Sequence, residues 1–153
     1  MTKTTIELKL NGETRRVDVE PNDVLLDVLR EKLGVKSPKV GCDRGDCGTC
    51  TVFFTGVTVR SCLVLAMEAD GAEVVTLEGI SKDGPTKLQQ AFVKHNSFQC
   101  GFCAPGMVLS ATELLQKNPH PAHEDIQEAI AGNLCRCTGY SPIIEAIADA
   151  AKK

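Results

Sequence analysis

Eight cysteines dominate the chemistry that this sequence of 153 residues could perform. The first four, Cys42, Cys47, Cys50 and Cys62, follow the spacing C-x4-C-x2-C-x11-C. An opening C-x4-C-x2-C with one distant cysteine is the pattern of plant-type [2Fe-2S] clusters, in which four thiolates hold two irons. This spacing therefore predicts a [2Fe-2S] cluster. A structural zinc site is the alternative, because zinc also accepts four cysteine thiolates.

The loop that carries the first three of these cysteines is rich in glycine. Gly41, Gly45 and Gly48 can adopt positive φ angles and let the backbone approach a cluster closely. Backbone N–H groups would then point at the sulfurs and stabilise the negative charge that reduction adds. We expect this loop to wrap around the cluster while Cys62 closes the ligand set from a different element.

The other four cysteines form two pairs that lie far apart in the sequence. Cys100 and Cys103 form a C-x2-C pair, and Cys135 and Cys137 form a C-x-C pair. A C-x-C pair cannot readily close as an unstrained disulfide, so two disulfides would need cross-pairing between distant loops. Metal ligation is the favoured interpretation. Zinc competes with a second [2Fe-2S] cluster here, because this spacing is less diagnostic than the first.

Each of these pairs stands before a predicted helix that opens with a proline. Pro105 and Pro142 suit the first helical turn, where the backbone N–H has no partner, and Ser141 is a suitable N-cap for the last helix. The positive ends of two helix dipoles would then converge on the metal. A [2Fe-2S] cluster with four thiolates is a dianion when oxidised, so this arrangement would favour it.

The residues around the first quartet predict a small α+β unit. Alternating hydrophobic residues and the Asn11-Gly12 pair indicate a β-hairpin, and a run of helical periodicity that ends at Gly34 indicates one helix. Further strand-like runs follow the cysteine loop. The predicted strands are residues 5–10, 15–19, 51–54, 57–60 and 73–77, and the predicted helix is residues 24–33.

The residues around the second quartet predict a small helical bundle. Residues 78–85 contain two glycines, a proline and charges, and composition changes there from β-branched to helix-forming residues, so we place the domain boundary at this stretch. Hydrophobic residues then recur at helical spacing in four segments. These segments centre on residues 88–92, 107–115, 126–130 and 143–150. Their core would be thin, so bound metal would help to stabilise it.

Composition excludes several classes of function. The formal net charge is −3, and no basic face or run of like charges predicts a nucleic-acid partner. The N-terminal sequence MTKTTIELKL lacks the apolar segment of a signal peptide, and no apolar run of about 18 residues predicts a membrane span. We therefore expect a cytoplasmic chain whose cysteines serve metal or redox chemistry rather than disulfides.

Three motifs resemble the small iron–sulfur subunits of the molybdenum hydroxylase, or xanthine oxidase, family. They are GCDRGDCGTC, QCGFCAPGM and GNLCRCTGY, and they occur in the family's order with all eight cysteines present. The resemblance implies a β-grasp, ferredoxin-like domain at residues 1–78 and a four-helix domain at residues 79–153, each with one [2Fe-2S] cluster. The implied ligands are Cys42, Cys47, Cys50 and Cys62 in the first domain and Cys100, Cys103, Cys135 and Cys137 in the second.

The same resemblance implies cofactors and partners outside this chain. In the family the cluster of the helical domain lies next to a molybdopterin in a separate large subunit, and the ferredoxin-like cluster lies nearer an FAD in a medium subunit. Gln99 is similar to a glutamine that hydrogen-bonds the pterin, and Cys137 is similar to the ligand closest to the pterin. A hetero-oligomer is implied, such as a dimer of heterotrimers, and a partner with an export signal could carry the chain out of the cytoplasm.

The implied role is a relay of single electrons between the molybdenum site and a flavin or another acceptor. No catalytic residue and no substrate site are predicted on this chain. Two other interpretations stay open: a free-standing ferredoxin-type carrier and a zinc-stabilised structural or interaction module. Members of the family act on aldehydes, purines, other N-heterocycles, carbon monoxide or aromatic acyl-CoA thioesters. The large subunit makes that choice, so this sequence does not indicate the substrate.

Overall fold

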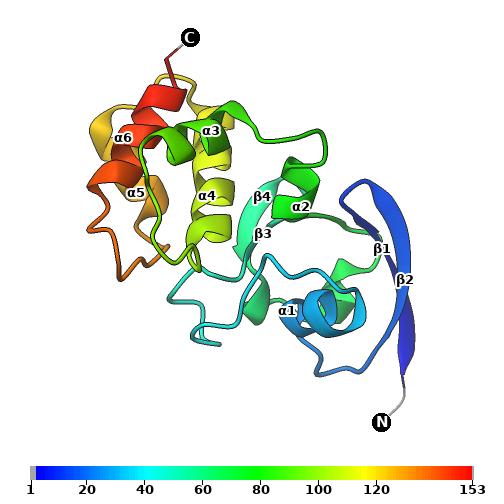
Figure 1. Ribbon diagram of the computed structural model, residues 1–153. Coiled ribbons are helices and arrows are strands. Elements are labelled where there is room, and N and C mark those ends of the chain that lie inside the picture. The colour runs from blue at the N-terminus through cyan, green and yellow to red at the C-terminus, as the bar shows by residue number, and fades with distance from the viewer. Residues whose placement is uncertain (1–2, 153) are drawn as a thin grey trace.

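The computed structural model describes residues 3–152 and has a mixed α/β fold. A sheet with one short helix lies on one side of the molecule, and the helices α3–α6 lie on the other side (Figure 1). This order of elements agrees with the predicted α+β class. Residues 1, 2 and 153, which the predicted domains 1–78 and 79–153 include, lie outside the described residues.

The sheet has five strands in the order β2-β1-β5-β3-β4. Strand β1 pairs antiparallel with β2 and parallel with β5, and β3 pairs antiparallel with both β5 and β4. Asn11 and Gly12 both have positive φ angles, 51° and 87°, which a two-residue hairpin turn favours and which confirms the predicted hairpin. The strands are β1 (Thr4–Leu10), β2 (Glu13–Val19), β3 (Thr51–Phe54), β4 (Val57–Arg60) and β5 (Glu73–Val75).

One face of this sheet packs on the first helix. Alternate residues of β1, Ile6, Leu8 and Leu10, are buried and share a core with Leu25 and Leu29. The predicted helix is present, but it begins as α1 (Leu25–Asp27) and continues as a π-helical segment (Val28–Lys32). The wider turn was not foreseen, because hydrophobic periodicity does not distinguish it from an α-helical turn. The positive φ of Gly34, 73°, ends the segment as expected.

The predicted strand at residues 73–77 is too long at its end. Strand β5 stops at Val75, and Leu77 belongs to a short helix, α2 (Leu77–Ile80). The side chain of Asn11 is the physical reason, since its Oδ1 accepts the backbone N–H of Thr76 at 2.8 Å and its Nδ2 donates to the Thr76 hydroxyl at 3.0 Å. These bonds replace the next pair of the β ladder. Two short 3-10 segments, Ser61–Leu63 and Ala66–Ala69, join β4 to β5.

The four predicted helical segments are all helices in the structure. They share one buried core, to which every one of the helices contributes. The helices are α3 (Lys87–Lys94), α4 (Ala104–Lys117), α5 (His123–Ile130) and α6 (Ser141–Ala150). The largest fully buried side chains of this core are Met107, Ile126, Ile130, Ile143 and Ile147. At one end, Asp149 of α6 accepts hydrogen bonds from Lys94 and His95, which lower the pKa of its carboxyl to about 2.

The expectation for the start of α6 is wrong in one respect. Ser141 is the first helical residue rather than the N-cap, which is Tyr140 with a φ of 73° and no side-chain capping bond. Pro142 still lies in the first turn, and Pro105 lies in the first turn of α4, as expected. The Tyr140 hydroxyl instead accepts the backbone N–H of Cys135.

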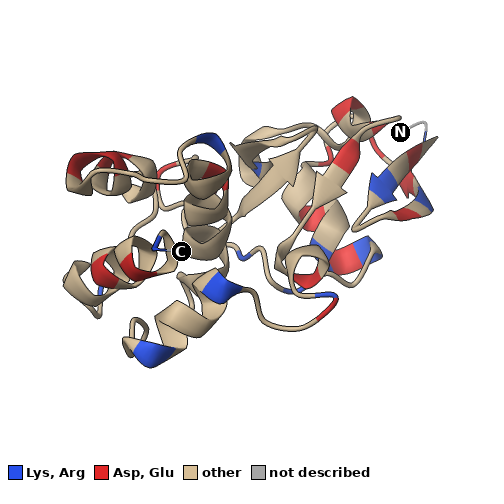
Figure 2. Cartoon of the chain, turned by 90° about the horizontal axis from the view of Figure 1, so that it is seen from above, with Lys and Arg blue, Asp and Glu red and all other residues tan. Residues whose placement is uncertain are grey.

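Charged residues of both signs are distributed over both parts of the molecule (Figure 2). Ion pairs of Lys or Arg with Asp or Glu join several neighbouring surface positions, such as Lys9 with Glu73 and Arg16 with Glu7. Within residues 3–152, no helix has the length and apolar character that a membrane crossing requires.

Truncating Ile147 tests whether the helices α3–α6 share a packed core. Ile147 is fully buried, so Ile147→Ala should cost about 2–5 kcal/mol of unfolding free energy and Ile147→Val about 0.5–1.5 kcal/mol. Both appear as a lower midpoint in urea denaturation followed by circular dichroism. Val93→Ala is the control, because Val93 is 78% exposed, and its midpoint should not move. Equal midpoints for Ile147→Ala and Val93→Ala would contradict the described core.

Candidate metal centres

The first four cysteines lie on two elements. Cys42, Cys47 and Cys50 lie on the loop before β3, and Cys62 lies in the 3-10 segment that follows β4. The Sγ atoms of Cys50 and Cys62 are 3.4 Å apart and both residues are buried. The backbone N–H of Cys47 donates to the Sγ of Cys42 at 3.4 Å. The quartet thus divides into an outer pair, Cys42 and Cys47, and an inner pair, Cys50 and Cys62.

Backbone N–H groups of the loop point at these sulfurs. Hydrogen bonds from the N–H groups of Arg44 and Cys47 lower the pKa of the Cys42 thiol to about 7. Burial and the neighbouring Cys50 raise the pKa of the Cys62 thiol to about 11, although the N–H of Gly45 acts in the opposite direction. The loop therefore supplies the donors that the sequence predicted. Metal binding would have to remove a proton from the buried inner pair.

The glycines of the loop act by close approach as well as by conformation. Gly45 and Gly48 have the predicted positive φ angles, 85° and 75°. Gly41 does not have a positive φ, so that part of the prediction is wrong, but a Cβ atom there would lie 2.7 Å from the Sγ of Cys47. At Gly48 a Cβ atom would overlap the Gly132 carbonyl oxygen and the Asn133 side chain. The loop can therefore contact the second half of the chain only with glycine at position 48.

The second quartet pairs across the sequence rather than within each motif. Cys100 lies before α4 and Cys103 is the N-cap of α4, while Cys135 and Cys137 lie on the loop between α5 and α6. The Sγ atoms of Cys100 and Cys137 are 3.8 Å apart, and both residues are exposed. Cys103 is buried and faces the half-buried Cys135. This quartet therefore has an exposed outer pair and an inner pair.

Burial raises the pKa values of the inner-pair thiols, whereas hydrogen bonds to their sulfurs lower them. Burial, together with Cys135, raises the pKa of the Cys103 thiol to about 12. Burial also raises the pKa of the Cys135 thiol, but hydrogen bonds from the Thr138 hydroxyl, 3.2 Å away, and from nearby backbone N–H groups outweigh it and lower that pKa. Tyr140 supports this loop, because its hydroxyl accepts the N–H of Cys135 at 2.9 Å.

Only one of the two helices brings its first turn directly to a cysteine. Cys103 caps α4, whereas Thr138, Gly139 and Tyr140 separate Cys137 from the start of α6. The donors near Cys135 come from this loop and not from α6. The expected convergence of two helix dipoles is therefore not present, and only the N-terminus of α4 lies at a cysteine.

The arrangement of the sulfurs fits a two-iron cluster better than a single ion. Two thiolates on one tetrahedral metal, with metal–sulfur bonds of about 2.3 Å, lie about 3.8 Å apart. The outer pair Cys100–Cys137, at 3.8 Å, has this separation, and the inner pair Cys50–Cys62, at 3.4 Å, is slightly closer. All eight cysteines are free thiols, so the disulfide alternative is not supported.

One hydrogen bond joins the two cysteine loops directly. The backbone N–H of Leu134 donates to the carbonyl oxygen of Cys47 at 2.9 Å, and Leu134 is the residue before Cys135. Arg60 holds the same segment, since one guanidinium nitrogen donates to the Gly132 carbonyl at 2.7 Å. A ligand of each quartet is thus linked through main chain and a single hydrogen bond.

Buried polar side chains, which the sequence did not single out, hold this contact in place. Asn133 is only 2% exposed, and its Nδ2 donates to the Ser110 hydroxyl at 2.6 Å. Its Oδ1 accepts the Thr51 hydroxyl at 3.3 Å, and Thr51 in turn accepts a bond from Arg60 at 2.7 Å. We call Arg60, Thr51, Asn133 and Ser110 the polar seam. Its only sequence signal is the position of Asn133 within the GNLCRCTGY motif.

The outer pair of the second quartet has an open environment. Gln99 lies beside it on the surface and donates from Nε2 to the Cys137 carbonyl at 3.0 Å. Phe102 and Leu134 are large hydrophobic residues that are about half exposed on the same two loops. The first quartet also has an exposed hydrophobic neighbour, Leu63, the residue after Cys62. Both quartets are thus accessible from outside the chain.

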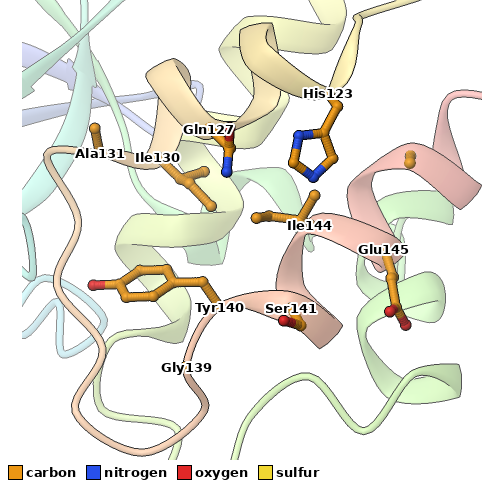
Figure 3. A pocket seen from close by; sticks show the side chains of 10 residues that line it. His123, Gln127, Ile130, Ala131, Gly139, Tyr140, Ser141, Ile144 and Glu145 are labelled. Carbon is orange, nitrogen blue, oxygen red and sulfur yellow. The ribbon is translucent and has the colours of Figure 1, made fainter.

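An open groove of about 760 Å³ lies between α5 and α6. Figure 3 shows His123 and Gln127 of α5 facing Ile144 of α6, with the Tyr140 ring at the other end. None of the eight cysteines lines this groove. Tyr140, which lines the groove, accepts the N–H of Cys135 through its hydroxyl.

Comparisons with known proteins agree with two cluster-binding units. Residues 8–77 match the 2Fe-2S iron-sulfur cluster binding domain family, and residues 76–148 match the [2Fe-2S] binding domain family. The chain is 53% identical to the nicotinate dehydrogenase small FeS subunit of Eubacterium barkeri, over 96% of this chain and 94% of that one. It is 47% identical to the nicotine 6-hydroxylase small subunit of Paenarthrobacter nicotinovorans, over 95% and 88% of the two chains.

Solved structures show the same fold. A chain of quinoline 2-oxidoreductase from Pseudomonas putida 86 superimposes with a TM-score of 0.94 and 44% identity, over 97% of this chain and 93% of that one. The aldehyde oxidoreductase from Desulfovibrio desulfuricans ATCC 27774 superimposes with a TM-score of 0.92 and 47% identity. In that comparison the match covers 96% of this chain but only 17% of the much longer relative.

Gly48→Ala tests the close contact between the two cysteine loops. An alanine at a positive φ costs about 1–2 kcal/mol, and the overlap with Gly132 and Asn133 should add about 1–3 kcal/mol. We expect a lower urea midpoint and a lower iron content in Gly48→Ala. Gly71→Ala is a matched control, because Gly71 has a φ of 73° but open space around it. Equal losses in the two variants would mean that the contact at Gly48 does not matter.

Proposed function

Because the chain belongs to the small [2Fe-2S] subunits of the molybdenum hydroxylase family, we propose that it passes electrons between a molybdopterin in a large partner subunit and an FAD in a medium one. The chain is the iron–sulfur, electron-transfer part of an oxidoreductase and carries two [2Fe-2S] clusters. When bound, each cluster accepts and releases one electron at a time, so a two-electron change at molybdenum is divided into single steps.

The observation that carries this proposal is the division of eight free thiols into two quartets, each with an outer and an inner pair. We assign Cys42, Cys47, Cys50 and Cys62 as the ligands of one cluster and Cys100, Cys103, Cys135 and Cys137 as the ligands of the other. The loop N–H groups and the Thr138 hydroxyl would stabilise the added negative charge.

Each quartet belongs to its own structural unit in this proposal. Residues 1–78 form a β-grasp, ferredoxin-like domain, which the five-stranded sheet packed on α1 supports. Residues 79–153 form a four-helix domain, which the shared core of α3–α6 supports. The hydrogen bond from the Leu134 N–H to the Cys47 carbonyl joins the two domains and supports an electron path from Cys135 to Cys47.

The second quartet faces the molybdenum side. Its outer ligands, Cys100 and Cys137, are exposed, so a pterin from another chain can reach them. The Gln99 amide is held beside Cys137 by its bond to the Cys137 carbonyl, and its Oε1 is left to accept a bond from a pterin edge. Cys137 is then the ligand nearest the molybdopterin.

The first quartet faces the flavin side. Leu63 is exposed next to Cys62, where a partner chain can cover it. The relatives are named as subunits, and this supports a hetero-oligomer with a large and a medium chain, such as a dimer of heterotrimers. We place the complex in the cytoplasm. Its substrate is determined by the large chain, so isolating that chain identifies it.

The metal content of the purified chain tests this function. Two [2Fe-2S] clusters predict iron and acid-labile sulfide, visible absorption, and bleaching of that absorption by dithionite. A colourless chain with zinc in both quartets would refute the proposal and favour a structural module.

Purification from the native source tests the partners. A free monomer without molybdenum or flavin would leave a diffusible carrier instead.

Replacing one ligand in each quartet tests the direction of electron flow. In the complex, Cys137→Ser should remove the cluster next to molybdenum and so block reduction of the first-quartet cluster by substrate. Cys47→Ser should allow substrate to reduce the helical-domain cluster while FAD reduction stalls. EPR spectra of samples frozen after substrate addition distinguish the clusters. Normal reduction of FAD in Cys47→Ser would contradict the assignment.

Removing the amide of Gln99 tests the pterin contact. Gln99→Leu should keep both clusters, because Gln99 ligates no metal, but should slow reduction of the helical-domain cluster by substrate. Gln90→Leu is the control, since Gln90 is also exposed and also donates to a backbone carbonyl, that of Pro85. Stopped-flow absorption measures the reduction rate. Equal rates in the two variants would assign Gln99 a purely local role.

A further inference from the structure

Lys39 is tied through its backbone to the loop of the first quartet. Its N–H donates to the Thr49 carbonyl at 3.0 Å, and its own carbonyl accepts the Thr49 hydroxyl at 3.0 Å. The same hydroxyl is 3.2 Å from the Sγ of Cys47. These bonds fix the position of Lys39 relative to the first metal centre.

The side chain of Lys39 extends toward the second metal centre. Its Nζ lies 5.5 Å from the centre of the Phe102 ring, in a cation–π contact. Phe102 is the residue before Cys103, the buried ligand at the N-terminus of α4. The Lys39 side chain therefore places a positive charge between the two cysteine loops.

This charge has no carboxylate partner within the described part of the chain. Lys9, Lys32, Lys94 and Lys117 each have a carboxylate within 4.0 Å, but Lys39 has none and donates only to the Ser37 carbonyl, at 3.2 Å. Glu78 lies further away and is bonded to Ser37 and Thr76. Lys39 is also half-buried, and desolvation followed by the nearby Arg30 lowers the pKa of its ammonium group. A half-buried, unpaired cation is unfavourable unless something supplies the opposite charge.

We propose that the iron–sulfur clusters supply that charge, and that Lys39 is a positioning residue that raises the reduction potential of the helical-domain cluster. This inference rests on the proposed function and on its ligand assignments. A [2Fe-2S] cluster with four thiolates gains a further negative charge on reduction, so a fixed cation beside it stabilises the reduced form more than the oxidised form. The ammonium group lies over the ring of Phe102, the residue before the ligand Cys103, so the helical-domain cluster is the one affected. An electron from molybdenum would thus be held at the contact between the two domains.

Redox titration of the full chain in its complex, monitored by EPR, tests the inference. In Lys39→Met the reduction equilibrium of the helical-domain cluster should fall about tenfold, which for one electron is a potential lower by about 59 mV. The cluster of the first quartet should change less. Lys39→Arg keeps the charge and should keep the wild-type potential. Lys36→Met is the matched control, because it removes an exposed lysine three positions away and should leave both potentials unchanged.

The outcomes separate this inference from the function on which it rests. If the wild-type chain titrates as two [2Fe-2S] clusters and Lys39→Met has the same potentials, the inference is wrong and the function stands. If the wild-type chain contains no such clusters, the function itself fails. If Lys39→Met loses iron, the reduction potential of the helical-domain cluster is measured in Lys39→Gln, which also lacks the charge. A potential in Lys39→Arg as low as in Lys39→Met would also overturn the inference, because packing and not charge would then be responsible.

Discussion

At Gly48 the first cysteine loop comes so close to Gly132 and Asn133 that no side chain fits between them. Several other features of the molecule follow from this approach. It brings the Cys47 carbonyl within reach of the Leu134 N–H, and it places the polar seam where water is excluded. Buried polar groups are stable only when they are hydrogen-bonded, and the groups of the seam bond one another. The two metal centres are therefore held in one fixed relation.

Polar contacts at this boundary fix the relative position of the two loops more exactly than apolar contacts would. Apolar residues could also bury the boundary, but they tolerate small shifts, whereas hydrogen bonds of defined length and direction fix the register of the two loops. The hydroxyl of Thr58 on β4 donates to the carboxylate of Glu113 on α4, which adds a further polar contact between the sheet and the helices. Electron transfer depends on the separation of the redox centres, so a boundary that fixes geometry suits a relay better than one that only buries area.

Local signals in the sequence predict most of the fold, and non-local contacts account for what they miss. Alternation in residues 5–10 with the Asn11-Gly12 turn, and helical periodicity in the second half, suffice for the hairpin and for α3–α6. The end of β5 was misplaced because it depends on the side chain of Asn11, 65 residues away. Spacing identified the eight cysteines, but Asn133 and Lys39 acquire their roles from Thr51 and Phe102, which only the folded chain brings near. Pairing of Cys100 with Cys137 likewise belongs to tertiary structure.

The unequal spacing of the two quartets also determines the order in which they are completed during synthesis. All four cysteines of the first quartet lie between residues 42 and 62, whereas the second quartet is incomplete until Cys137 has been added. Domains generally fold in the order in which the ribosome releases them. The Cys47 carbonyl and the Arg60 guanidinium are therefore synthesised before Gly132 and Leu134, their partners in the folded chain. The first half of the chain thus provides the surface on which the loop with Cys135 and Cys137 can fold.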